Sequence, residues 1–276
     1  MSDEAGDAAQ PKGGALRRAV LGLGVILLIA AVALVAAGPF LFRAGVLDLK
    51  TATAGVGQAA MASFIAAGLA GILGLFLSVA DRRHRGAIVG LLVLVAAGIG
   101  GGALFGQNVM RGEFPPIYDV QTDWSQPVAF TEETLQVRRA EDAVRIRDDA
   151  IVPEGQGRWS GQTFAAAQAD FYRDIKPLVV RARPADATVA AANAAKQLGW
   201  DVMLSDPSAG LVEAVYHSRW YGLAADISVR VTEVREGSRI DVRSTSRQPG
   251  PDMGANASRV QQLLDEIAFA LRGSGS

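Results

Sequence analysis

Three long apolar stretches dominate the first 110 residues of the chain. Each is long enough to cross a bilayer as a helix, which takes about 20 residues, and none contains Asp, Glu, Lys or Arg. Since a charge at the centre of a membrane is costly, this pattern is typical of spanning segments. We therefore predict a tail over residues 1–18 and a membrane region over residues 19–110, with transmembrane helices at about Ala19–Phe42, Val56–Val79 and Ala87–Phe105.

The pattern changes after residue 170 to short alternating segments bounded by turn residues. Strands are predicted at Leu178–Arg181, Trp200–Leu204, Leu211–Tyr216, Ala225–Val234 and Arg239–Ser246, and helices at Pro184–Gly199 and Gly254–Arg272. The order β-α-β-β-β-β-α, with tight turns between consecutive strands, implies an antiparallel sheet with both helices on one face. The fold class is α+β, with three N-terminal transmembrane helices followed by this sheet domain over residues 171–276.

Residues 111–170 show no such periodicity and are interpreted as an extended linker and an irregular subdomain. Two prolines after Phe114 favour a stiff, extended spacer. We expect Trp159 to pack against the domain. Between residues 131 and 154, acidic side chains alternate with arginines, which favours a solvated surface over a site for acid–base chemistry. These arginines are Arg138, Arg139, Arg145 and Arg147.

The last two predicted strands define a polar face of the sheet. With Glu236 and Gly237 as a two-residue turn, Asp226 is opposite Arg247, and Arg230 is opposite Arg243. All four side chains then point away from the face that carries the apolar residues of the strands. One face is therefore core, and the other carries alternating acid and base.

Basic residues predict the orientation in the membrane, because cytoplasmic loops carry an excess of Lys and Arg. The N-terminal tail and the loop between the second and third spans are both basic, whereas the other loop carries only two basic residues with one acid between them. We therefore place the N-terminus in the cytoplasm and everything after Phe105 on the far side of a bacterial inner membrane, which is the periplasm in a Gram-negative cell. The residues concerned are Lys12, Arg17 and Arg18, then Arg82, Arg83 and Arg85, against Arg43, Asp48 and Lys50.

Composition excludes several classes of function. Residues 111–276 carry 19 Lys and Arg against 23 Asp and Glu, a net charge of −4, so no nucleic-acid partner is expected. The absence of Cys excludes thiolate catalysis, and two His are too few for a His-rich metal site. We expect no cofactor, no metal and no catalytic motif.

Several short motifs carry a resemblance to a known family. Asp241–Arg247 and Asp252–Arg259 form its C-terminal signature, and the supporting pieces are Pro115–Asp119, Tyr172–Leu178, Leu198–Trp200, Glu213-Ala214 and Arg219–Gly222. Together they resemble the uncharacterised bacterial family called domain of unknown function 1499, over roughly residues 112–272. Two departures are Ala225-Asp226, where the family tends to have two acids, and the insertion of Gln248-Pro249-Gly250. The resemblance implies no activity.

The end of the last strand and the start of the last helix contain the candidate ligand site. Arginines, hydroxyls and a helix N-terminus there suit a small anion. The alternative is a structural network in which Asp252 caps the helix, Arg247 pairs with Asp226 and Asn256 holds the loop. The candidate ligand-binding residues are Asp226, Arg243, Ser244, Ser246, Arg247, Asp252, Asn256 and Arg259.

The expected function is that of a membrane-anchored periplasmic domain that binds a small anionic or lipid-like ligand or an envelope protein. One alternative is an envelope hydrolase that uses Ser246 or Asp226 with His217, and another is a scaffold for a membrane partner. The enzyme reading is the weaker one, because His217 is the only histidine in the domain. Small residues in the spans favour a hairpin packed on itself, with a homodimer as the alternative. These residues are Ala66, Ala70, Gly74, Gly98 and Gly102.

Overall fold

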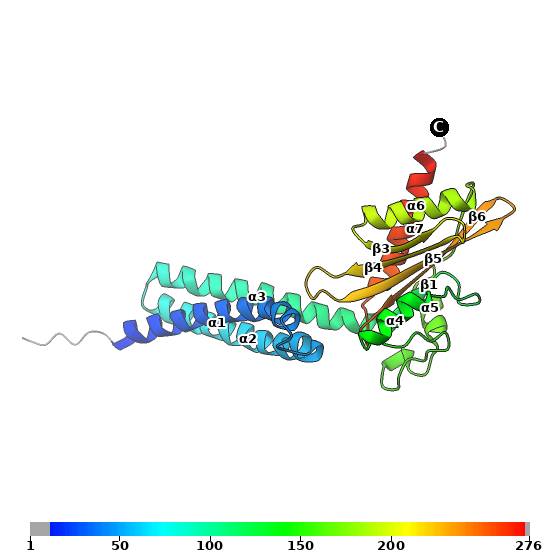
Figure 1. The fold of residues 1–276 in the computed structure, drawn as a ribbon. Coiled ribbons are helices and arrows are strands. Elements are labelled where there is room, and N and C mark those ends of the chain that lie inside the picture. The colour runs from blue at the N-terminus through cyan, green and yellow to red at the C-terminus, as the bar shows by residue number, and fades with distance from the viewer. Residues whose placement is uncertain (1–11, 274–276) are drawn as a thin grey trace, which may run out of the picture. The chain divides into compact units, whose positions relative to one another are not determined.

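The computed structural model describes residues 12–273, which form two compact units with the boundary between Met110 and Arg111. The first unit contains three long helices, all long and apolar enough to cross a membrane (Figure 1). They confirm the three predicted apolar helices. Residues 1–11 of the predicted tail lie outside the described residues. The elements are α1 Lys12–Arg43, the short π-helix η1 Thr51–Gly55, α2 Val56–Ala80 and α3 His84–Glu113.

Small residues let the three helices approach closely. A Cβ atom on Gly90 of α3 would lie 2.7 Å from the Leu75 nitrogen of α2, and one on Gly74 would lie 2.3 Å from a Leu21 methyl carbon of α1. Gly98 and Gly102, in contrast, have no neighbouring atom within 4 Å of such a Cβ position. Self-packing therefore uses some of the predicted small residues and leaves this pair open.

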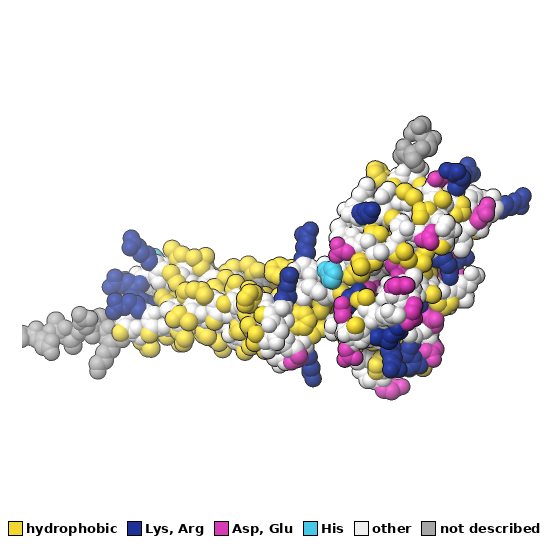
Figure 2. Space-filling view, in the orientation of Figure 1, with side chains coloured by type: hydrophobic (Ala, Val, Ile, Leu, Met, Phe, Trp, Pro, Cys, Tyr) yellow, Lys and Arg dark blue, Asp and Glu magenta, His cyan; other side chains and the backbone are white. Residues whose placement is uncertain are grey.

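The surface of the three helices matches a hydrocarbon environment. Large apolar side chains point outward along each helix, and Lys and Arg side chains gather at the helix ends (Figure 2). At one such end, Arg17 of α1 pairs with Asp81 after α2 at 2.6 Å. An apolar exterior with charges confined to the ends is the arrangement that a bilayer requires.

The second unit is built on a six-stranded antiparallel sheet of order β1-β6-β5-β4-β3, with β2 also paired to β6 (Figure 1). Both β1 and β2 pair with β6 on its outer side, at different positions along the strand. The strands are β1 Asp119–Gln121, β2 Leu178–Val180, β3 Asp201–Asp206, β4 Leu211–His217, β5 Ala224–Val234 and β6 Gly237–Ser246. The helices are α4 Glu132–Ala140, the 3₁₀ turn η2 Gly157–Trp159, α5 Phe164–Phe171, α6 Pro184–Gln197 and α7 Ala255–Gly273.

The core lies between one face of the sheet and helices α6 and α7. Strands β5 and β6 contribute apolar side chains at every second position, and α7 contributes a stripe at helical spacing. This arrangement confirms the predicted α+β class and the two helices on one face. Trp159 joins the same core, as expected. The central residues are Ile227, Val229, Val231, Ile240, Val242, Val260, Leu263 and Ile267.

The predicted pairing of β5 with β6 was wrong by two residues. The turn consists of Arg235 and Glu236, so that Asp226 is opposite Thr245 and Arg230 is opposite Asp241. Gly237 is the first residue of β6, and this position requires glycine because a Cβ atom there would lie 2.2 Å from the Val180 carbonyl oxygen of β2. A shift of two residues keeps every side chain on its predicted face.

Candidate functional site

The predicted site residues gather at the end of β6 but divide between the two faces of the sheet. Ser244 and Ser246 point toward α7, whereas Arg243 and Arg247 point to the opposite face with Asp226. Alternate residues of a strand point to opposite faces, so the single cluster expected from the sequence is instead two groups.

The group beside α7 is a closed hydrogen-bond network. Ser244 Oγ donates to Asn256 Oδ1 at 2.7 Å, and Asn256 Nδ2 donates to Ser246 Oγ at 3.0 Å and to the Tyr118 carbonyl at 2.9 Å. Arg259 donates to Ser244 Oγ at 3.2 Å and lies over the Tyr216 ring. These polar side chains therefore form hydrogen bonds with one another, which fits the alternative of a structural network.

Asp252 caps the start of α7 in the way that the structural alternative describes. Its carboxylate accepts the backbone N–H groups of Gly254 at 2.9 Å and Asn256 at 2.7 Å. Burial raises the pKa of the Asp252 carboxyl and lowers the pKa of the Arg259 guanidinium. Both charges are therefore held in a partly desolvated environment at this helix end.

On the opposite face, Asp226 is shared between two arginines. Arg247 donates to it through Nε at 3.0 Å and through Nη2 at 2.6 Å, and Arg138 of α4 donates to it at 2.5 Å. Asp226 is 1% exposed and Arg138 is 3% exposed. The hydrogen bonds that Arg247 donates to Asp226 outweigh the effect of burial and raise the pKa of Arg247. The half-exposed Glu141 accepts from the outer side of Arg247 at 2.7 Å.

Arg243 forms a second buried ion pair on this face. It contacts both oxygens of Asp119, at 3.0 Å from Nε and 2.6 Å from Nη2, and donates to Asp148 at 2.8 Å. Burial raises the pKa of Asp119 and lowers that of Arg243, but the hydrogen bonds that Arg243 donates to Asp119 give Arg243 a raised pKa overall. Because a two-point Arg–carboxylate contact favours the charged forms, we regard the pair as ionised at neutral pH.

The segment from Thr122 to Asp148 covers the polar face. Its carbonyl oxygens accept from Arg230, Ser228 and Arg243, and Thr131 and Thr134 donate to the buried Glu213 of β4. The prediction of a solvated surface over residues 131–154 was therefore wrong for Arg138, although Arg139, Arg145 and Arg147 are exposed. The charged face of the sheet is therefore covered by this segment, whose polar groups form hydrogen bonds with the charged side chains of the strands.

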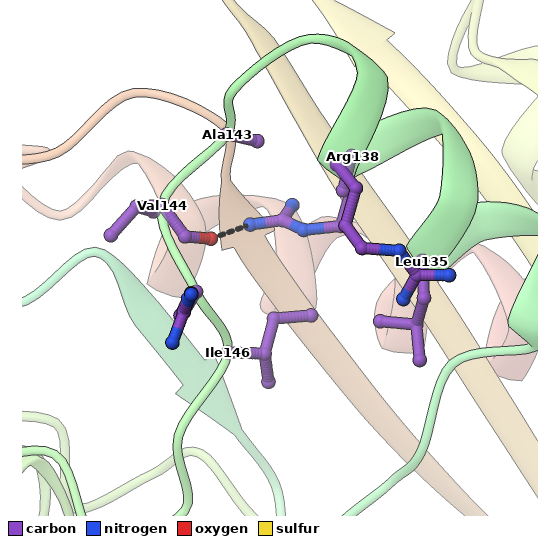
Figure 3. A pocket seen from close by; sticks show the side chains of 7 residues that line it. Leu135, Arg138, Ala143, Val144 and Ile146 are labelled. Carbon is purple, nitrogen blue, oxygen red and sulfur yellow. Dashed lines mark hydrogen bonds between the residues drawn. The ribbon is translucent and has the colours of Figure 1, made fainter.

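A pocket of about 310 Å³ opens between α4 and the chain that follows it. Three arginines line it, and Arg138 reaches across to donate to the Val144 carbonyl at 2.7 Å (Figure 3). The same guanidinium bonds Asp226, so the pocket borders the buried ion network. Sequence reasoning missed this site; one available signal was Thr131 followed by two acids, a typical helix N-cap. The lining residues are Leu135, Arg138, Arg139, Ala143, Val144, Arg145 and Ile146.

His217 does not meet the groups that the hydrolase alternative needs. It is half-exposed, and its Nε2 lies 3.9 Å from Asp201 of β3. Asp226 is enclosed by two arginines, and Ser246 lies on the other face of the sheet. The predicted dyads of His217 with Ser246 or with Asp226 are thus not assembled. Within residues 12–273, no three His, Asp or Glu side chains gather in a way that could hold a metal ion.

Comparison with known proteins identifies the family of the second unit. No curated protein matches the chain. The family described as protein of unknown function (DUF1499) matches residues 119–267, which include every strand of the sheet and most of α7. The match covers more than half of the chain and confirms the resemblance inferred from the short motifs. The chain therefore belongs to the DUF1499 family, here joined to three helices long and apolar enough to cross a membrane.

Proposed function

We propose that this chain is a membrane-anchored binding protein that takes a small anionic ligand into the arginine-lined pocket beside Asp226. The observation that carries the proposal is the lining itself, which contains three arginines and no carboxylate among its seven residues. The volume of about 310 Å³ lies at the small end of the range for ligand pockets, roughly 300–1,000 Å³.

The three arginines differ in how firmly the protein holds them. Arg138 is buried and fixed by Asp226 and by two carbonyl oxygens, those of Val144 and Ser246. Arg139 pairs with the exposed Glu132, a contact that water screens. Arg145 is exposed and forms no ion pair with any described residue between 12 and 273. A fixed cation beside two adjustable ones suits a carboxylate or a phosphate monoester.

The remaining lining residues indicate the rest of the ligand. Leu135, Ala143, Val144 and Ile146 are aliphatic, so the pocket offers apolar contact next to the guanidinium groups. An anion with a short apolar portion therefore fits better than a bare inorganic ion. Of the residues predicted from the sequence, Asp226 and Arg247 support the wall of the pocket, since the Arg247 carbonyl accepts the Val144 N–H at 2.9 Å.

The binding test uses the full chain in nanodiscs of zwitterionic lipid. We expect phenyl phosphate to raise the melting temperature more than inorganic phosphate does, with chloride at equal ionic strength as the reference, because a ligand that binds only the folded state stabilises it. Arg145→Ala should lose the shift for both anions. Arg235→Ala, which removes an exposed arginine in the β5–β6 turn, should keep it. Equal loss in both variants would mean general charge screening and would overturn the proposed site.

We further propose that the domain lies on the non-cytoplasmic side of the bacterial inner membrane. Three spans with a basic N-terminal tail and a basic loop between α2 and α3 support this orientation. An alkaline phosphatase joined after Ser276 should then be active, and a fluorescent protein that matures only in the cytoplasm should stay dark there. The opposite pair of results would reverse the orientation and would leave the pocket proposal untouched.

A further inference from the structure

The loop between β4 and β5 is closed by three hydrogen bonds and presents an exposed indole. Ser218 closes the loop, because its N–H donates to the Leu223 carbonyl and its hydroxyl accepts the Leu223 N–H, both at 2.9 Å. The Gly222 N–H also donates to the Ser218 carbonyl at 2.9 Å, and Gly222 has a φ of +66°. At the tip, the Trp220 side chain is 73% exposed. A fixed loop that holds its largest apolar group in water indicates a contact surface.

This loop lies at the end of the sheet where the chain enters the domain. His217 and Ala224 pair at the base of the loop, and the next residue, Ala225, pairs with Ser246 of β6. The Ser246 N–H in turn donates to the Tyr118 carbonyl at 2.9 Å. Strands are spaced by about 4.8 Å, so roughly 10 Å separates the base of the loop from the entering chain.

A second observation brings the loop close to Arg111, the first residue of the second unit. Burial raises the pKa of the Tyr221 hydroxyl, and the positive charge of Arg111 partly opposes this rise. That charge can act only if Arg111 lies near Tyr221. Arg111 belongs to the last turn of α3, the helix that contains the third apolar stretch.

The length of chain between the membrane and the domain is short. Phe105 ends the third apolar stretch, and α3 continues to Glu113, a rise of about 12 Å. The extended residues from Glu113 to Tyr118 add at most roughly 17 Å. The interfacial layer of a bilayer is itself about 5–8 Å deep on each side. The length of the connection therefore allows the loop to reach the headgroup layer.

We propose that the tip of the β4–β5 loop, with Trp220 and Tyr221, inserts into the headgroup region of the same bilayer that holds α1, α2 and α3. Indole and phenol rings prefer this layer, because one part of each ring system is apolar and the other can hydrogen-bond to water. The cationic Arg111 beside the loop suits anionic lipid headgroups. The occupant of this surface is thus the lipid of the anchoring membrane. The inference is independent of the anion pocket.

The test measures quenching of tryptophan fluorescence by lipids brominated near the headgroup, with the full chain reconstituted in vesicles that contain them. Trp124, Trp159 and Trp200 are partly or fully buried within the domain. We therefore expect the quenchable part of the emission to come from Trp220 and to disappear in Trp220→Phe. Because Trp220 is exposed and makes no core contact, this change leaves the fold intact.

A matched control places an indole elsewhere on the same domain. Phe269 is 68% exposed and lies on α7, 13 residues after Asn256, which contacts Tyr118. That separation corresponds to about 20 Å along the helix, away from the chain entry. In the Trp220→Phe background, Phe269→Trp should restore emission without restoring quenching. The inference fails if Trp220→Phe keeps the quenching of the unmodified chain, or if an indole at position 269 is quenched equally.

Discussion

At the scale of single residues, the buried Asp226 carboxylate joins two segments of the domain through ion pairs. Arg247, the residue after β6, approaches it from one side, and Arg138 approaches it from α4, 88 residues away in sequence. Removing one partner of a buried ion pair costs far more than removing an exposed charge, because the remaining charge stays in a poorly solvating environment. The Arg138–Asp226 ion pair therefore links the short helix α4 firmly to the sheet.

The first prediction compares Arg247 with Arg235. Arg247→Ala should lower the free energy of unfolding by about 2–4 kcal/mol, less than the full cost of breaking a buried pair because Arg138 still neutralises Asp226. Arg235→Ala removes an exposed side chain and should cost within about 0.5 kcal/mol. Chemical denaturation of both variants measures the difference, and equal stability of the two would contradict the importance of Arg247.

The second prediction concerns the dependence of stability on pH at Asp123. The side-chain hydrogen bond from Ser125 and the ion pair with Arg239 hold its pKa at about 2, below the ordinary value of 3.8. A depressed carboxyl pKa contributes stability that is fully present above the unfolded value and is lost as pH falls through the folded one. The stability gap between the unmodified chain and Asp123→Asn should therefore shrink between about pH 4 and pH 2.

Urea denaturation across that pH range measures the gap. Asp174→Asn, a change at an exposed carboxylate, serves as the matched control and should show a smaller dependence on pH. A gap for Asp123→Asn that stays constant down to pH 2 would mean that the native contacts of Asp123 do not favour its charged form.

At the scale of elements, the long strands and both covering helices were predictable from the sequence, because their apolar positions repeat at the spacing of a strand or a helix. The same reasoning missed β1, which has only three residues, and α4, which packs through polar side chains. Thr131, Thr134 and Arg138 carry no hydrophobic period, so the spacing of apolar residues did not predict a helix there, and only the N-cap at Thr131 indicated one.

The candidate site could be predicted only in part from the sequence. The Asp226–Arg247 pair was inferred from a register that is wrong by two residues, yet the two side chains still meet, because Arg247 is long enough to reach diagonally across the ladder. The contribution of Arg138 was not predictable, since nothing in the local sequence links it to a strand 88 residues later. The pocket depends on that tertiary contact.

The third prediction concerns the close approach of α2 and α3. Gly90→Leu should break the packing of the two helices, because even a Cβ atom there would lie 2.7 Å from the Leu75 nitrogen. Gly98→Leu should leave the packing intact, since no atom lies within 4 Å of its Cβ position. The chain contains no cysteine, so cysteines introduced on α2 and α3 can report the packing by disulfide formation. Equal disulfide yields for both variants would contradict the prediction.

The same Gly98 variant tests the homodimer, which is the alternative to self-packing that the small residues of the spans leave open. Gly98 lines an apolar groove of about 400 Å³ together with Gly102, Met61, Phe64 and Phe105. If a second copy occupies this groove, Gly98→Leu should reduce chemical cross-linking between chains in the membrane while intrachain packing persists. Unchanged cross-linking would mean that the groove faces lipid.

At the scale of the whole molecule, the sheet domain contains its own core. The central cluster runs from Ile117 to Ile267 and includes none of the described residues of the first unit, 12–110. The fourth prediction is that residues 112–276, produced without the apolar helices, fold alone with a single cooperative melting transition. A non-cooperative melt, or aggregation in every buffer tried, would indicate that the apolar helices complete the domain.

The pairing of β1 with β6 has a consequence for biosynthesis. Asp119 enters the sheet at its first strand, and its partner Arg243 lies 124 residues later, in the last strand. Folding that depends on such distant contacts is slow, because a large loop must close before they form. A growing chain therefore carries Asp119 and Arg138 without their partners until β5 and β6 have been made.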